Sequence, residues 1–169
     1  MKPKTPENSK TIQTDIVMPG DTNSLNNLFG GELLARMDKV ASISAIKHSE
    51  QIVVTASINN VAFGEPVPNG SILTIEAKVS RAFNTSMEVF IDVWKQNKTH
   101  KKKIKVNEAI YTFVALSKSG QTVKVPTLVP ETELEKKRFD AALRRRQLSL
   151  VLAGKMKANE ATELKAIFD

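Results

Sequence analysis

Apolar residues recur at helical spacing just after residue 28 and alternate with polar residues in most later segments. Two sets of positions follow a three- and four-residue period, Leu33, Met37, Val40 and Ser44, and Leu34, Ala41 and Ala45. This pattern predicts one long helix from about Phe29 to Ile46.

Segments rich in β-branched residues predict strands on both sides of that helix. Their approximate ranges are 11–18, 51–61, 72–83, 86–96 and 104–117, with a candidate edge extension at 123–125. Apolar Leu73, Ile75, Ala77 and Val79 alternate with Ile72, Thr74, Glu76 and Lys78, and Val89, Ile91 and Val93 alternate with Glu88, Asp92 and Lys95. This alternation is typical of an antiparallel sheet with one solvated face. A single long helix with antiparallel strands indicates an α+β fold, a sheet wrapped around a central helix.

Residues 129–169 are predicted to form a C-terminal helical extension. Thr132 and Glu135 have the spacing of a capping box, and acidic residues near the start with basic residues near the end suit the helix dipole. The apolar stripe of this helix is thin: Leu134, Phe139, Ala141 and Leu143. We therefore expect it on the surface or against a neighbouring subunit. Asn159 is the candidate cap of a last short helix.

The composition excludes several kinds of site. The 169 residues suit one domain, and the chain has no cysteine, so disulfides and thiolate catalysis are excluded. The two histidines, His48 and His100, offer little for a metal centre or a serine–histidine triad, so no metal site is expected; His48 is read as a charge partner at the helix C-terminus. Residues 1–10 lack the apolar core of a secretory signal and are predicted to be a flexible tail. No apolar run reaches membrane-spanning length, so a cytoplasmic protein without a membrane partner is expected.

The formal net charge is +7. The positive residues concentrate in two places: Lys95, Lys98, Lys101, Lys102, Lys103 and Lys105, and Arg144, Arg145 and Arg146. Nucleic-acid binding is one interpretation, but the lysines lack the interleaved aromatic residues that single-strand binders use. Capture of an anionic cofactor is a second interpretation of this positive charge. For residues 101–103, the simplest interpretation is a solvated hairpin loop.

A polar, turn-rich run from Asp21 ends abruptly at Phe29-Gly30-Gly31, where the long helix begins. Glycines there allow a ligand close to the backbone, and free amides favour negative charge. Within the helix, Glu32 and Arg36 are read as an ordinary solvated pair, whereas Asp38 has no basic neighbour three or four residues away. Two interpretations of Asp38 stay open: a carboxylate used in chemistry, or one at the edge of the apolar stripe that points to water.

The motifs and their order resemble the hotdog-fold acyl-CoA thioesterases of the cytosolic acyl-CoA hydrolase group. The similar segments are Asp21-Thr22-Asn23, Phe29-Gly30-Gly31, Met37-Asp38, residues 53–67 with Gly70, Val93-Trp94, residues 111–116, Val125-Pro126 and residues 129–132. The resemblance covers roughly residues 12–146. It implies a hotdog domain over residues 11–128, followed by the extension at 129–169.

By resemblance, Asp38 acts as general base or nucleophile, and Asn23 holds the water or the thioester. The amides of Gly30 and Gly31 polarise the thioester carbonyl. Coenzyme A is part of the substrate, so no separate cofactor is expected. The family's site lies between two hotdog units, which implies a homodimer as the minimal active unit, with Asn23 and Asp38 from different subunits, and trimers of dimers as the expected assembly.

The family also places a segment equivalent to Arg81, Thr85 and Ser86 near the nucleotide of coenzyme A; Asn84-Thr85-Ser86 is equally suited to a simple hairpin turn. Two alternatives to an acyl-CoA thioesterase remain open. One is another hotdog enzyme that acts on acyl thioesters, such as a dehydratase. The other is a non-hydrolytic module that binds acyl-CoA or nucleic acid.

Overall fold

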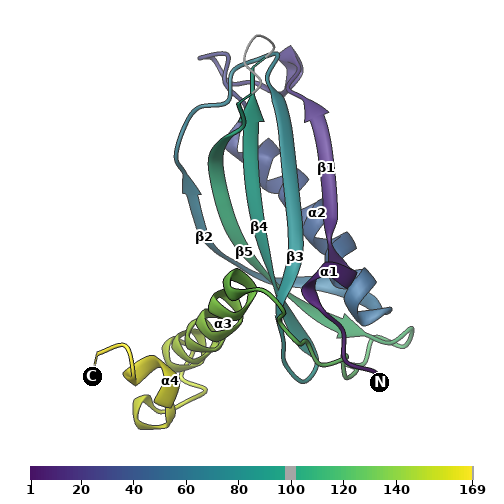
Figure 1. Cartoon of the computed structure of the whole chain (residues 1–169), viewed down its shortest axis with the longest axis vertical. Coiled ribbons are helices and arrows are strands. Elements are labelled where there is room, and N and C mark those ends of the chain that lie inside the picture. Colours follow the sequence, from purple (N-terminus) through teal and green to yellow (C-terminus); the bar gives the residue numbers. More distant parts are fainter. Residues whose placement is uncertain (98–101, 169) are drawn as a thin grey trace.

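A computed structural model describes residues 1–97 and 102–168 and places the predicted strands in one antiparallel sheet (Figure 1). The strands are β1 (Thr11–Ile16), β2 (Ile52–Phe63), β3 (Ile72–Ala82), β4 (Ser86–Gln96) and β5 (Ile104–Leu116), and their order is β1-β3-β4-β5-β2. The α+β class is confirmed. Residues 123–125 form no strand, although the amide of Val123 donates to the carbonyl of Ala115 (3.0 Å). Lys98, His100 and Lys101 lie outside the described residues.

The long helix α2 (Gly30–Ser49) lies along the concave face of the sheet and ends three residues later than predicted. The hydroxyl of Ser49 donates to the carbonyl of Ala45 (2.8 Å), and Glu50 ends the helix in the left-handed conformation, φ 57°. Because the last turn contains Lys47, His48 and Ser49, it carries no apolar signal that the periodicity could detect.

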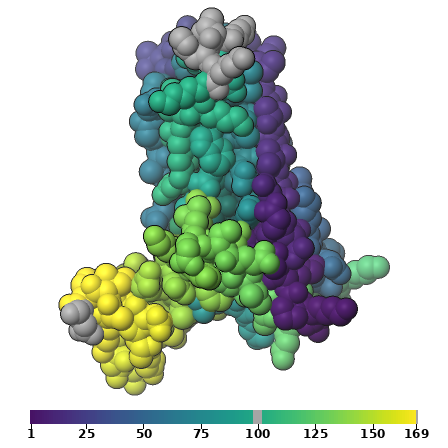
Figure 2. All heavy atoms as spheres, in the orientation of Figure 1, coloured from purple at the N-terminus to yellow at the C-terminus, as the bar shows by residue number. Residues whose placement is uncertain are grey.

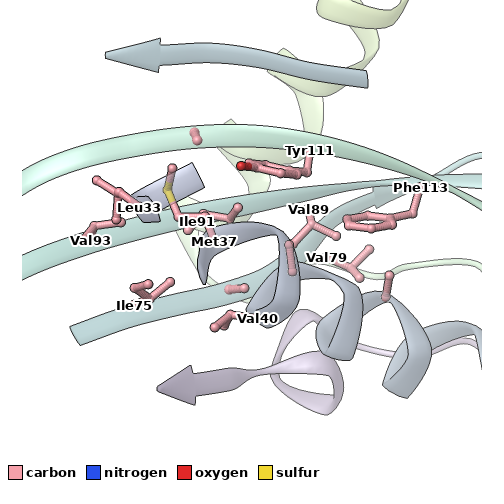
Figure 3. Close-up of a cluster of buried hydrophobic side chains, with 14 of the residues drawn as sticks. Leu33, Met37, Val40, Ile75, Val79, Val89, Ile91, Val93, Tyr111 and Phe113 are labelled. Carbon is pink, nitrogen blue, oxygen red and sulfur yellow. The ribbon is translucent and has the colours of Figure 1, made fainter. Parts of the chain in front are cut away.

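The core lies between α2 and the inward faces of the strands (Figure 3). Leu33, Met37 and Val40 of α2 pack against side chains from the three inner strands: Ile75, Val79, Val89, Ile91, Val93, Tyr111 and Phe113. The faces of β3 and β4 predicted to be apolar are buried against α2. Each such side chain contributes about 1.5–3 kcal/mol by leaving water, so this cluster fixes the helix against the sheet.

Helix α3 (Glu133–Leu152) crosses the opposite, outer face of the sheet of its own chain (Figures 1 and 2). The capping box is confirmed, since Thr132 Oγ1 accepts from the amide of Glu135 (3.2 Å) and the Glu135 carboxylate accepts from the amide of Thr132 (3.0 Å). Beyond this contact with the sheet, α3 projects away from it and carries α4 (Thr162–Lys165) at its far end.

Ion pairs rather than an apolar stripe hold α3 to the sheet. Arg138 binds Asp92 (2.7 Å) and lies over the ring of Phe90, and Arg145 makes two hydrogen bonds to Glu88 (2.7 and 2.9 Å). Glu88 and Asp92, predicted to be on the solvated face, are therefore buried. That prediction was wrong because the period of a strand shows which residues share a face, not what covers the face.

Two predictions for the chain ends also need correction. Residues 4–10, predicted to be part of a flexible tail, include helix α1 (Pro6–Ser9), and the Lys4 ammonium donates to the carbonyl of His48 (2.9 Å) and to Glu50 (2.6 Å). Asn159 does not cap the last helix but lies in the 3-10 turn Ala158–Glu160. The last helix docks on α3 instead, since the amide of Leu164 donates to Gln147 Oε1 (2.9 Å).

Candidate active site

Asp38 lies on the side of α2 that faces the edge strand β2. Thr55 Oγ1 donates a hydrogen bond to Asp38 Oδ1 (2.8 Å), and the Asp38 side chain is half-buried. The carboxylate therefore has a polar partner and is still open to solvent. Sequence reasoning missed Thr55, because a threonine inside a β-branched strand carries no signal of its own.

Tyr111 of β5 lies beneath this carboxylate in the core. Its hydroxyl donates to the carbonyl of Leu34 (3.1 Å), one turn before Asp38 on α2. Burial, together with the charge of Asp38, raises the pKa of Tyr111 to about 12. The phenol thus remains neutral over the physiological range.

The N-terminus of α2 has no side-chain cap. In the described part of the chain, no group accepts a hydrogen bond from the amides of Gly30 and Gly31. Both glycines also serve close packing: a Cβ on Gly30 would meet the ring of Phe63 at 3.3 Å, and one on Gly31 would meet the ring of Phe29 at 3.3 Å. The absent side chains therefore allow aromatic residues close to two free amides.

Asn23 forms the turn that precedes α2. Its Oδ1 accepts from the amides of Leu25 (2.9 Å) and Asn27 (3.3 Å). The side-chain oxygen Oδ1 therefore faces the turn. Within residues 1–97 and 102–168, the side-chain nitrogen Nδ2 donates to no group. The side chain has a free donor in a fixed orientation.

A cavity of about 340 Å³ lies beside the start of α2. Asn23 and Gly30 line it together with apolar side chains of Leu28, Leu33, Phe63, Val67 and Val106. Asp38 does not line it, since eight helical residues separate Asp38 from Gly30 by about 12 Å along the axis. Within one chain, the structure brings Asn23 and Gly30 together and leaves Asp38 apart.

The sequence predicted a solvated Glu32–Arg36 pair. In the structure Arg36 is buried, and Glu32 is only one of its partners. Besides Glu32 (2.9 Å), it binds Asp21 (2.7 Å) and lies 3.3 Å from Asp15. Asp21 also accepts from the amide of Met18 (2.8 Å), and this bond, followed by the bond from Arg36, lowers the pKa of Asp21. Arg36 therefore ties α2 to the loop that carries Asn23.

Two of the three residues expected near the nucleotide of coenzyme A, Arg81 and Ser86, contact α3. Arg81 Nη1 donates to the carbonyl of Phe139 (2.9 Å) and its guanidinium lies over the Phe139 ring. Ser86 is buried, and its hydroxyl accepts from Arg146 Nη1 (3.2 Å). The carbonyl of Thr85 accepts from the amide of Ala115 on β5 (2.9 Å), and the amide of Phe83 donates to the carbonyl of Ser86 (2.8 Å), which closes the hairpin between β3 and β4.

His48 is fully buried and does not act as the charged partner of the helix C-terminus that we expected. Its Nε2 lies 2.8 Å from the carbonyl of Pro126, and burial lowers its pKa. Within the described residues, no three histidine, aspartate or glutamate side chains gather as a metal site. No helix of the same residues has the length and apolar character needed to cross a membrane.

Comparison with known sequences places the chain among thioester hydrolases. The model of the thioesterase superfamily matches residues 25–101. The chain is 39% identical over 137 residues to YkhA of Bacillus subtilis, described as an uncharacterized acyl-CoA thioester hydrolase, with 81% of this chain and 80% of that protein covered. It is 35% identical over 141 residues to the human cytosolic acyl coenzyme A thioester hydrolase, but that match covers 82% of this chain and only 37% of the human protein.

Solved structures share the fold over nearly the whole chain. An apo-hexameric acyl-CoA thioesterase superposes with a TM-score of 0.87 at 37% identity, with 90% of this chain and 98% of that chain covered. The Staphylococcus aureus acyl-CoA hydrolase, in complex with butyryl coenzyme A, coenzyme A and coenzyme A disulfide, gives 0.83 at 35% identity, with 96% and 98% covered. Further structures of the Staphylococcus aureus enzyme carry alanine in place of one aspartate, one asparagine or one threonine. This chain therefore belongs to the hotdog-fold acyl-CoA thioester hydrolases of the thioesterase superfamily.

Proposed function

We propose that the enzyme hydrolyses acyl-CoA to a free fatty acid and coenzyme A, with Asp38 as the general base or nucleophile. The hydrogen bond from Thr55 to Asp38 carries this proposal. It orients one carboxylate oxygen, and the half-buried position leaves the other within reach of a water or a thioester carbonyl. The alanine variants of the Staphylococcus aureus enzyme are numbered at the same intervals as Asn23, Asp38 and Thr55, which supports the assignment.

The oxyanion is assigned to the start of α2. The amides of Gly30 and Gly31 are uncapped at the start of α2, where the helix dipole gives partial positive charge, and Gly30 lines the adjacent cavity. A thioester carbonyl held there would have its developing negative charge stabilised. The apolar lining by Leu28, Leu33 and Val106 suits an acyl chain.

The active unit is a homodimer in this proposal, in which Asn23 of one subunit serves Asp38 of the other. Their separation within one chain supports it, and so does the free edge of the sheet, where β2 exposes Ile52, Val54, Ile58 and Phe63. An exposed apolar edge strand favours pairing with another chain. The hexameric relative supports a trimer of dimers as the full assembly.

Coenzyme A, with its nucleotide, is part of the substrate, so the enzyme needs no separate cofactor. We assign this part to the side of the molecule that holds Arg81, Thr85 and Ser86, where the sheet meets α3. A cytoplasmic location follows the human relative, which is named cytosolic.

The test is release of free thiol from acyl-CoA esters of increasing chain length, with wild type and Asp38→Ala side by side. We expect release by wild type and a loss of at least about a hundredfold in Asp38→Ala at an unchanged oligomeric state. Lys39→Ala, a neighbouring exposed position on α2, is the matched control. Equal release by wild type and Asp38→Ala would contradict the role of Asp38.

A further inference from the structure

Tyr111, the single tyrosine of the chain, is fully buried on β5. Figure 3 shows its ring in the core with Leu33 and Met37 of α2. The ring is stacked with that of Phe113, two residues along the strand, with the centroids 6.4 Å apart and 15° between the ring planes. Packing therefore fixes the ring, and with it the direction in which the hydroxyl points.

The hydroxyl of Tyr111 contacts the backbone of the helix turn that carries Asp38. It donates to the carbonyl of Leu34 at 3.1 Å. In an α-helix each carbonyl accepts from the amide four residues later, so the partner of the Leu34 carbonyl within α2 is the amide of Asp38. One carbonyl thus joins a phenol of the sheet to the backbone from which the carboxylate of Asp38 extends.

The side chain of Asp38 is held from the neighbouring strand. Thr55 on β2 donates to Asp38 Oδ1 at 2.8 Å and lies opposite Phe113 of β5. Residues directly opposite each other share a face of the sheet, so Thr55 is on the face that carries Tyr111 and Phe113 toward α2. The register of β2 against β5 shifts just after Thr55, a bulge of the kind that aims side chains at functional sites. Two adjacent strands therefore hold Asp38, one at its carboxylate and the other at its backbone.

We infer that Tyr111 is a positioning residue for Asp38: its hydroxyl fixes the helix turn from which the carboxylate extends, while Thr55 fixes the carboxylate itself. Because the side chain of Tyr111 is fully buried, it does not touch the substrate and acts through Asp38. The charge of Asp38 adds to burial in raising the pKa of Tyr111, which agrees with the closeness of the two groups. A displacement of about 1 Å in a catalytic group can slow a reaction about a hundredfold, so fixing this turn matters for the rate. The inference rests on the proposed role of Asp38 in hydrolysis.

The first experiment measures the steady-state kinetics of Tyr111→Phe, which keeps the ring and removes only the hydroxyl. We expect kcat for one acyl-CoA to fall about fivefold with KM within about twofold of wild type, because the loss falls on the transition state and not on substrate binding. Ser44→Ala is the matched control: it removes a buried hydroxyl of α2 that has no hydrogen-bond partner within the described residues, and it should leave kcat unchanged. Unchanged kcat in Tyr111→Phe, a change confined to KM, or an equal fall in Ser44→Ala would overturn the inference.

A double variant separates positioning of Asp38 from a general loss of stability. If Tyr111 and Thr55 both serve the orientation of Asp38, the loss of kcat in Tyr111→Phe combined with Thr55→Val should be smaller than the product of the two single losses. The reason is that a carboxylate without Thr55 already rotates freely, so fixing its backbone matters less. A merely structural tyrosine would slow the Thr55→Val enzyme as much as it slows wild type, and the full product would therefore count against positioning.

Amide hydrogen exchange tests the same contact without turnover. In Tyr111→Phe we expect faster deuterium uptake at residues 34–38, with unchanged uptake in the last turn of α2, because only the turn bonded to Tyr111 is loosened. Uptake that stays unchanged at residues 34–38 would refute the inference even if Asp38→Ala abolishes hydrolysis. Full activity of Asp38→Ala would instead contradict the proposed function, and the inference with it.

Discussion

The hydroxyl of Thr55 on β2 donates to Asp38 Oδ1 on α2 at 2.8 Å. This bond joins the central helix to the edge strand of the sheet and fixes one of the two carboxylate oxygens. In the described part of the chain, Oδ2 has no hydrogen-bond donor. One oxygen is therefore held by the protein, and the other remains for water or substrate.

Thr55→Val keeps the shape of the side chain and removes the donor. We expect kcat to fall about tenfold, or about 1.4 kcal/mol in the barrier, because the carboxylate loses its orientation. Thr55→Ser keeps the hydroxyl and should stay near wild type. Steady-state kinetics with one acyl-CoA give kcat for both variants. If Thr55→Ser is as slow as Thr55→Val, packing of the threonine methyl group matters rather than the hydrogen bond.

Asn23→Ala and Asp38→Ala should complement each other when their subunits assemble together. If each site takes Asn23 from one chain and Asp38 from another, random assembly of equal amounts restores about one quarter of the sites. Each variant alone should be nearly inactive. Thiol release by the co-expressed mixture measures this fraction, and a mixture no more active than the single variants would mean that both residues act from the same chain.

Arg36→Met should destabilise the region around Asn23. The change removes a buried guanidinium from between Asp15, Asp21 and Glu32, so those carboxylates repel one another and the loop loses its tie to α2. We expect Tm to fall by about 5 °C and kcat to fall with it. Thermal unfolding of Lys39→Met, an exposed position on the same helix, gives the control and should match wild type.

His48 should make the protein less stable in mild acid. Burial lowers its folded pKa below the ordinary value of 6.5, so the unfolded chain binds the proton more readily. Its contribution to stability is complete above about pH 6.5 and is lost as the pH falls below that value toward the folded pKa. The Lys4 ammonium, bonded to the His48 carbonyl, acts in the same direction.

The free energy of unfolding of wild type, measured from pH 8 to pH 5, should therefore decline more steeply than that of His48→Gln. Glutamine cannot be protonated there and keeps an amide donor for the carbonyl of Pro126. Parallel pH profiles for the two proteins would show that His48 remains neutral in both states or charged in both.

Periodicity along the chain was enough to predict the five strands, the long helix α2 and the inner face of the sheet. The period of Leu33, Met37 and Val40 fixed the buried side of α2, and alternation in β3 and β4 fixed the inward residues, because burial of apolar surface follows the geometric period of each element. The candidate residues Asn23, Gly30, Gly31 and Asp38 could also be named from the sequence, through the resemblance of their motifs to a known family.

The contacts between distant segments could not be predicted from these patterns. Thr55 and Asp38 are brought together by the pairing of β2 with β5 and by the packing of α2, and no local pattern encodes that contact. The covering of Glu88 by Arg145 likewise depends on where α3 crosses the sheet. Hydrogen bonds and ion pairs between distant segments depend on relative placement, which arises from the summed packing of the core, whereas periodicity records only the environment of each segment.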